Sequence, residues 1–223
     1  NIIVSNEKSS SEGNVLFHGQ IINHQYSKSF EFEEKFRRYC EKYLSSQINY
    51  FSFLRSFNEL EIAGKFSQTP KYHKIFRSCN RGSKQNRWCG QCSKCLFSYL
   101  ILYPFLGKKL KEIFGKDLLN DTSLAPVMEE LLQLPGKFKP FECVGTKEEI
   151  EYAMLLGILK GQRKKLLDIY KNQISVLILG MGKEGKTTAK LLKKNKITEP
   201  IVNVFNIFYP SFMYISLLFS KYN

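Results

Sequence analysis

The sequence predicts a mixed α/β fold of one or two domains, and three observations support this prediction. Short apolar runs separated by polar turns, typical of strands, occupy the first 22 residues. Longer segments with apolar residues at helical spacing follow as far as residue 170. A last apolar run then leads into a glycine-rich turn and a basic segment. The chain has 223 residues, of which 43% are hydrophobic, so it can bury a core and is not a disordered or collagen-like protein.

The first half of the chain mixes predicted strands, one helix and an irregular segment. Residues 2–4 and 15–17 are apolar and predict strands joined by a polar loop. Residues 30–53 predict a helix, because their aromatic side chains recur at helical spacing. Residues 64–95 contain too few apolar side chains to become ordered alone. We therefore expect another source of order in that segment.

Three helices are predicted in the second half, over residues 96–114, 118–134 and 146–170. Lysines near the end of the first suit the negative end of a helix dipole. The third has the signature of a capping box, because Thr146 is followed three residues later by Glu149. We expect this helix to begin directly after Thr146.

The end of the chain predicts a separate unit that begins near residue 172. Residues 176–179 read as a strand, and the turn after them fits both the dinucleotide-binding pattern G-x-G-x-x-G and the P-loop pattern G-x-x-x-x-G-K-T. Spacing alone does not separate the two patterns. Four residues of this turn are candidates for binding phosphate: Gly180, Gly182, Gly185 and Lys186. Residues 201–223 form an apolar tail interrupted by polar residues and proline, so we expect no membrane span.

The net charge indicates which kind of partner the protein binds, and its cysteines indicate the cellular compartment. The 34 Lys and Arg residues exceed the 20 Asp and Glu residues, which gives a net charge of +14 and favours phosphate-bearing partners. No secretory signal is visible at the start, and four of the six cysteines lie close together. This indicates a cytoplasmic protein with metal-ligating thiols rather than a disulfide scaffold.

The clustered cysteines predict a metal site. Cys79, Cys89, Cys92 and Cys95 follow the spacing C-x9-C-x2-C-x2-C, and four thiolates can complete the tetrahedral shell of a structural Zn²⁺ ion. An iron–sulfur cluster is the lesser alternative. Basic residues in this segment, together with Trp88, also allow a zinc-stabilised nucleic-acid contact through phosphates and base stacking.

Three polar segments carry the remaining candidate site residues. The first, residues 5–14, offers Asn6, Glu12 and Asn14 as groups that could hold a nucleotide or Mg²⁺. The second, residues 23–29, offers binding groups at Asn23, Tyr26, Ser27 and Lys28, and Lys28 could meet a phosphate or carboxylate. The third, residues 140–145, contains Cys143. This thiol, which lies outside the cysteine cluster, and His24 of the second segment could titrate near neutral pH and carry protons.

Taken together, these segments resemble the UDP-N-acetylmuramoyl-L-alanyl-L-glutamate epimerase family of peptidoglycan synthesis. The matching stretches, in order, are SNEKSSSEGN, INHQYSKSFEFE, RSCNRGSKQNRWCGQCSKC and PFECVGT. The cysteine segment is also similar to the zinc site of PP-loop ATPases. The resemblance implies that residues 1–171 are the C-terminal portion of a PP-loop-like enzyme, with a zinc knuckle at 79–95. It also implies the substrate, a UDP-linked muramoyl dipeptide, and the use of ATP with Mg²⁺.

The chemistry that the resemblance implies is inversion of the terminal glutamate through an acyl-adenylate, with release of AMP and diphosphate. Adenylation neutralises the carboxylate, so that the neighbouring α-hydrogen can be removed from one face and a proton returned to the other. Cys143 and His24 are the candidate proton carriers. The PP-loop itself is absent and the chain starts without Met, so we expect a piece of a longer enzyme that is inactive alone.

Residues 172–200 resemble the first strand and turn of the UDP-N-acetylmuramoylalanine:D-glutamate ligase family, which implies an epimerase fused to the start of a Rossmann-like ligase domain. Two alternatives to the epimerase remain. One is a zinc-stabilised nucleic-acid-binding protein, which the charge of +14 suits. The other is a PP-loop enzyme that modifies nucleotides and shares only the zinc site. For the epimerase we expect neither nucleic acid nor a membrane as partner.

Overall fold

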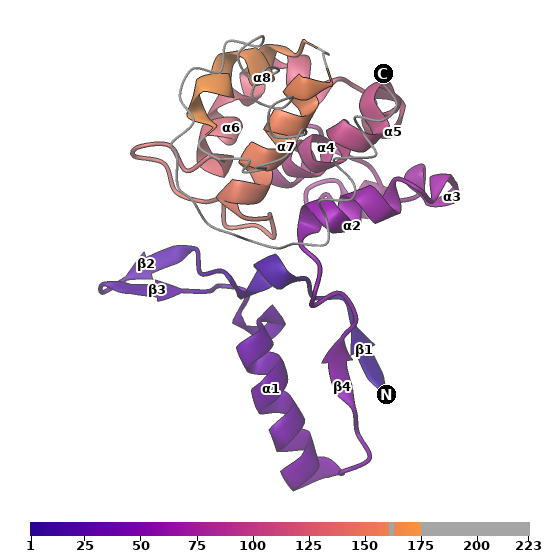
Figure 1. Cartoon of the computed structure of the whole chain (residues 1–223), viewed down its shortest axis with the longest axis vertical. Coiled ribbons are helices and arrows are strands. Elements are labelled where there is room, and N and C mark those ends of the chain that lie inside the picture. The colour runs from indigo at the N-terminus through magenta and orange to yellow at the C-terminus, as the bar shows by residue number, and fades with distance from the viewer. Residues whose placement is uncertain (161–162, 175–223) are drawn as a thin grey trace, which may run out of the picture.

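The computed structural model describes residues 1–160 and 163–174. It is mixed, as predicted: a helical body contains most of the core, and an N-terminal part contains the strands (Figure 1). The strands are β1 (Ile2–Val4), β2 (Val15–Phe17), β3 (Gln20–Ile22) and β4 (Tyr50–Ser52). The helices are α1 (Phe30–Tyr39), α2 (Glu59–Phe66), α3 (Pro70–His73), α4 (Ser93–Leu106), α5 (Leu110–Phe114), α6 (Ala125–Leu131), α7 (Lys147–Leu159) and α8 (Lys165–Tyr170).

Helix α4 lies at the centre of the helical body because it is apolar on nearly every side. It packs against α7, α2 and α6, and its residues form much of the buried core. Gly157 of α7 allows a close approach to α4, since a β-carbon there would lie 2.9 Å from the Tyr103 ring. The predicted capping box at the start of α7 is confirmed: Thr146 accepts from the Glu149 backbone, and Glu149 accepts from the Thr146 backbone.

The strands form two separate two-stranded sheets. β1 pairs with β4 in parallel, with Ile2 opposite Tyr50. β2 and β3 form an antiparallel hairpin that projects from the body in Figure 1. The two predicted strands near the N-terminus are therefore confirmed, but they lie in different sheets.

The predicted helices are shorter than expected, for identifiable reasons. The helix predicted over residues 30–53 ends with a wide turn at Cys40–Leu44, and the chain then forms β4 because a partner strand is available far away in sequence. In the segment 118–134, short 3-10 turns come first and α6 begins only at Ala125, where the following proline suits the first turn of a helix. The helix predicted over residues 146–170 is two helices, α7 and α8.

Two predictions concern residues outside the part of the chain that the structure describes. They are the strand, turn and helix with the candidate phosphate-binding residues Gly180, Gly182, Gly185 and Lys186, and the apolar tail at 201–223. Among the residues that the structure does describe, none of the helices combines the length and the apolar character needed to cross a membrane.

Candidate functional site

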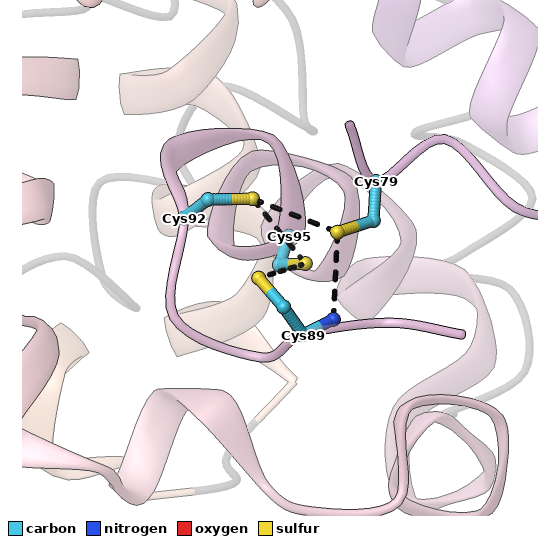
Figure 2. A group of neighbouring side chains, drawn as sticks. All are labelled: Cys79, Cys89, Cys92 and Cys95. Carbon is cyan, nitrogen blue, oxygen red and sulfur yellow. Dashed lines mark hydrogen bonds between the residues drawn. The ribbon is translucent and has the colours of Figure 1, made fainter. Parts of the chain in front are cut away.

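The four clustered cysteines point toward one another in the structure (Figure 2). Their sulfur atoms all lie within 4.8 Å of one another. The Sγ–Sγ distances are 3.9 Å from Cys79 to Cys92, 3.7 Å from Cys89 to Cys95 and 3.5 Å from Cys92 to Cys95. Four sulfurs at Zn–S distances of about 2.3 Å lie roughly 3.8 Å apart in a tetrahedron. These three distances are close to the value for a tetrahedral zinc site, so the four cysteines could hold a metal ion.

Backbone N–H groups surround the same sulfurs. Gly82 and Cys89 donate to Cys79 Sγ at 3.1 and 3.4 Å, and Gly90 donates to Cys95 Sγ at 3.4 Å. Gly90 has φ of +68°, a conformation that a residue with a β-carbon adopts at a cost. Such donors stabilise negative charge on sulfur and orient metal ligands. The segment thus folds into a cradle for anionic sulfur.

The protonation of the sulfurs also fits a cation. The hydrogen bond between Cys92 and Cys95 lowers the pKa of Cys92 to about 5, and the same contact raises the pKa of the Cys95 thiol. Burial raises the pKa of Cys89. Without a metal, the crowded sulfurs must therefore share protons, because several thiolates in contact would repel one another. A divalent cation would replace those protons and leave four thiolates.

Trp88, by contrast, is not placed to stack on a nucleic-acid base. Only 8% of its surface is exposed, and its ring packs against Phe114 with 4.2 Å between ring centroids and against Phe76 at 5.2 Å. The stacking part of the nucleic-acid alternative is therefore wrong. The tryptophan connects the cysteine segment to the hydrophobic core instead.

A cavity of about 260 Å³ lies next to α4 and α2. Its polar wall combines acidic, basic and thiol groups with a glutamine and two serines, and its apolar wall comes mainly from α2 and α4. The charged and thiol groups are Glu7, Glu59, Lys28, Lys94 and Cys143. The volume is below the range typical of pockets for whole drug-sized ligands. The cavity is suited to a small polar group or to one end of a larger molecule.

Two of the residues predicted from the sequence meet in this cavity. Lys28 Nζ donates to Cys143 Sγ at 3.0 Å and to Gln25 Oε1 at 3.1 Å. An ammonium group at this distance stabilises negative charge on sulfur. The arrangement places the Cys143 thiol beside a fixed positive charge.

Glu142 connects this thiol to the cysteine cluster. Its carboxylate accepts hydrogen bonds from the Ser93 hydroxyl at 2.8 Å and the Lys94 backbone at 2.9 Å, both in the first turn of α4. Cys92 is the N-cap of this helix, and Cys95 also lies in its first turn. The residue before Cys143 is therefore fixed to the same helical turn that carries two of the sulfurs.

His24, the second predicted proton carrier, does not line this cavity. Its Nδ1 lies 2.7 Å from Asn14 Oδ1, and its ring packs against Phe141 with 4.4 Å between centroids. Burial lowers the pKa of His24, as do the positive charges of Lys139 and Lys28. The histidine is therefore held neutral at a position beside the cavity rather than in its wall.

The other predicted binding residues are divided between several places. Glu12 forms an ion pair with Lys139 at 2.7 Å, and the Asn23 side chain supports the loop through the Ser10 carbonyl. Asn14 Nδ2 is buried and has no hydrogen-bond partner among the described residues. The last three lie elsewhere: Asn6 in the wall of a second, open hollow near β1, Tyr26 accepting from Lys35 beside α1, and Ser27 at the exposed surface.

Arg55 holds the two polar loops together, a role that the sequence did not reveal. Its guanidinium donates to the carbonyls of Glu7 and Lys28, both at 2.9 Å, and to Ser10 Oγ at 3.1 Å. It also forms a two-point contact with Glu33 Oε2 at 2.9 and 3.2 Å. Because Glu7 and Lys28 both line the cavity, this one side chain fixes the shape of its polar wall.

Glu59 is a second residue that the sequence did not reveal. It is the first residue of α2, where Asn58 and Glu61 form a capping box. Burial is the main cause that raises the pKa of its carboxyl to about 8; the negative charges of Glu7 and Glu149 add to this, and Lys94 and Lys28 oppose it. The capping box marks the start of a helix in the sequence, but it does not say which side chain faces a cavity.

The raised pKa of Glu59 predicts a pH-dependent gain in stability for Glu59→Gln. Below pH 4.5 the carboxyl is protonated in both the folded and unfolded states and costs nothing. As pH rises toward 8, the unfolded chain loses this proton more readily, so the folded state is progressively destabilised. Glutamine imitates the neutral acid. We expect the full-length variant to melt at least about 2 °C above the wild type at pH 9 and no higher at pH 4.

Glu112→Gln is the matched control, because Glu112 is exposed on α5. Its melting temperature relative to the wild type should not change between these pH values. A Glu59→Gln difference that is the same at pH 4 and pH 9 would contradict the described environment of Glu59.

These features define an α/β protein with a four-cysteine group that could hold a metal, next to a small charged cavity. Two family models match the chain: the MurL N-terminal domain over residues 1–53 and the MurL C-terminal domain over residues 75–174. Together they cover more than half of the sequence, and the chain belongs to the MurL family.

Named relatives agree with this family. The chain is 40% identical over 171 residues to the UDP-N-acetyl-alpha-D-muramoyl-L-alanyl-L-glutamate epimerase of Xanthomonas oryzae pv. oryzae, which covers 74% of this chain and 38% of the relative. It is 41% identical over 168 residues to the protein of the same name from Salinispora tropica, covering 73% and 36%. The chain thus spans well under half the length of these relatives. No solved structure matches it significantly.

Proposed function

We propose that the protein containing this chain inverts the terminal L-glutamate of UDP-N-acetylmuramoyl-L-alanyl-L-glutamate to D-glutamate during peptidoglycan precursor synthesis. The observation that carries the proposal is the identity of about 40% over 171 residues to proteins that bear this epimerase name. The matches to the two family models, over residues 1–53 and 75–174, include Lys28 and Cys143 of the cavity. We assign the activity to the longer protein, because the chain covers only part of each relative.

The cavity supports the proposal through its chemistry. An epimerase must remove a hydrogen from carbon and return a proton to the opposite face, which requires groups that exchange protons and groups that stabilise negative charge. Cys143 supplies a thiol, while Lys28 and Lys94 supply positive charges that suit the carboxyl groups of a glutamyl residue. A volume of about 260 Å³ suits the amino-acid end of the substrate, with the sugar nucleotide outside.

ATP is the second substrate in this proposal. A free carboxylate next to the α-carbon makes the hydrogen there a poor acid, because its removal would place a second negative charge beside the first. Transfer of AMP to that carboxylate, with release of diphosphate, removes the obstacle. We place the ATP and Mg²⁺ contacts in the longer protein, with Asn14 and Lys28 of this chain directed toward the bound substrates.

The four cysteines, in the same proposal, bind a structural Zn²⁺ ion. All four tetrahedral positions are filled by protein sulfur, which leaves no position for water or substrate. When bound, the ion stabilises the segment between α3 and α4. Its role is to position α4 and, through Glu142, the residues around Cys143.

The full-length protein tests this function directly. With the UDP-muramoyl dipeptide and ATP, we expect D-glutamate to form together with AMP and diphosphate. Cys143→Ala should reduce the rate at least about 100-fold, since loss of a positioned acid–base group costs 10²–10⁴ in rate. Chiral analysis of the hydrolysed glutamate and nucleotide chromatography give the two readouts.

Cys40→Ala is the control for cysteine removal, because Cys40 is buried at the end of α1 and does not line the cavity. It should retain the wild-type rate. Formation of ADP instead of AMP would remove the adenylation step from the proposal. An unchanged rate in Cys143→Ala would remove this thiol from the mechanism.

A further inference from the structure

The cavity contains an acidic group whose role is not accounted for by the folding of the chain. Glu59 lines the cavity, and its backbone N–H donates to Glu149 Oε1 at 2.7 Å. Its carboxyl group, in contrast, has no hydrogen bond or ion pair among the residues that the structure describes. Capping of α2 depends on Asn58 and Glu61 instead. A half-buried carboxyl group that stabilises nothing, beside a cavity, indicates a role toward a ligand.

The neighbouring charges place Glu59 in the same site as Cys143. Lys28, which donates to Cys143 Sγ at 3.0 Å, is close enough to Glu59 to influence its proton affinity, and so is Lys94. Glu59 comes from the start of α2, whereas Cys143 comes from the segment before α7. Two proton-exchanging groups from different elements therefore border one small cavity.

His24 is less suited to act as the partner of Cys143. It lies outside the cavity wall, its Nδ1 is occupied by Asn14, and its ring is covered on one side by Phe141. An inversion requires the second proton carrier to contact the same carbon as the first. Glu59 lines the same cavity as Cys143, whereas His24 does not.

We propose that Glu59 is the acid that returns a proton to the face of the glutamyl α-carbon opposite Cys143. This inference rests on the proposed epimerase function. The Cys143 thiolate takes the α-proton, so that an S–H bond forms as the C–H bond breaks and its electron pair moves into the activated carboxyl group. Protonated Glu59 then gives its proton to the other face, and the electron pair returns to form the new C–H bond. Exchange with water removes the proton from Cys143 and restores one to Glu59.

The electrostatic surroundings agree with this order of events. Burial and the nearby carboxylates Glu7 and Glu149 raise the pKa of Glu59 to about 8, so most of it carries a proton at neutral pH and can donate it. The Lys28 ammonium stabilises negative charge on the Cys143 sulfur, which suits the group that accepts the first proton. Glu59 is thus suited to donate a proton, and Cys143 is suited to accept one.

An experiment that measures removal of the α-hydrogen separately from inversion tests the proposal. The full-length wild type, Glu59→Gln and Cys143→Ala are each incubated with the L-epimer and ATP in D₂O, and the recovered glutamate is analysed for α-deuterium and chirality. We expect Glu59→Gln to lose inversion by at least about 100-fold but still to incorporate α-deuterium into recovered L-glutamate, because Cys143 removes the hydrogen and returns deuterium to the same face. Cys143→Ala should neither exchange nor invert.

The controls separate failure of this inference from failure of the proposed function. Glu112→Gln, with the same change of charge at an exposed position of α5, should behave as the wild type. A wild type that shows neither exchange nor inversion would overturn the epimerase function itself. If the wild type is active, three results would overturn the role of Glu59. Glu59→Gln could invert glutamate at the wild-type rate, or it could behave in the same way as Cys143→Ala. In the third result, Cys143→Ala would exchange without inversion and Glu59→Gln would do neither.

Discussion

Replacement of Cys95 with alanine is expected to abolish the proposed zinc binding and to lower the melting temperature of this part of the full-length protein by about 10 °C or more. Cys95 is completely buried, and its sulfur lies 3.5 Å from that of Cys92 and 3.7 Å from that of Cys89. Structural zinc contributes about 10–16 kcal/mol in isolated zinc-finger peptides. Loss of even a third of that value would shift the unfolding of this part of the protein by about 10 °C, because 1 kcal/mol corresponds to roughly 2–4 °C for a unit of the size of this chain.

Cys40→Ala separates loss of metal from loss of a buried side chain. Cys40 is as buried as Cys95, with 1% of its surface exposed, but it is not one of the four clustered cysteines. This control should retain the zinc and melt within about 4 °C of the wild type. Metal content is measured by mass spectrometry of the dialysed proteins. Wild-type zinc in Cys95→Ala, or equal melting shifts in the two variants, would contradict the four-cysteine site.

Replacement of Arg55 with methionine is expected to destabilise the protein by about 3–5 kcal/mol. Only 5% of the Glu33 side chain and 16% of the Arg55 side chain are exposed, so the variant would leave a buried carboxylate without its main partner. Arg37 contacts Glu33 at 3.8 Å but is itself 43% exposed and offers partial compensation. The variant also loses the hydrogen bonds to the loops that carry Glu7 and Lys28. Urea denaturation of the full-length protein gives the free energy of unfolding.

The exposed ion pair between Lys35 and Glu31, which lies on α1 as Glu33 does, provides the comparison. Lys35 and Glu31 are both more than 60% exposed, and Lys35→Met should cost no more than about 1 kcal/mol. Arg55→Met should in addition reduce the epimerisation rate, because it frees the backbone that holds Lys28, whereas Lys35→Met should not. Equal effects of the two substitutions on unfolding would show that Arg55 does not hold the loops as described.

Local signals in the sequence predicted local structure well. The pair Thr146 and Glu149 correctly marked the start of α7, because a capping box depends on residues three positions apart. The prediction that the helix beginning at residue 30 continues to residue 53 was wrong. The chain leaves the helix so that Tyr50–Ser52 pairs with Ile2–Val4, a contact between segments far apart in sequence. Helical periodicity cannot reveal a partner strand that lies some 45 residues away.

The candidate site was predictable to a similar extent. Cysteine spacing predicted the four-cysteine group that could hold a metal, because the ligands of such knuckles are close in sequence. The contact between Lys28 and Cys143 joins residues far apart in the chain, and only the motif resemblance suggested that their segments belong together. Glu59 and Arg55 gave no signal. Their significance comes from burial and from partners in other segments, which single residues in a sequence do not show.

One carboxylate, that of Glu142, ties the thiol at position 143 to the helical turn on which two of the clustered sulfurs are mounted. Under the proposed function, disorder of that turn would displace the sulfur of Cys143, even though an ion bound by the four cysteines would not contact the substrate. The proposed structural ion would therefore be as necessary for turnover as a catalytic ion would be.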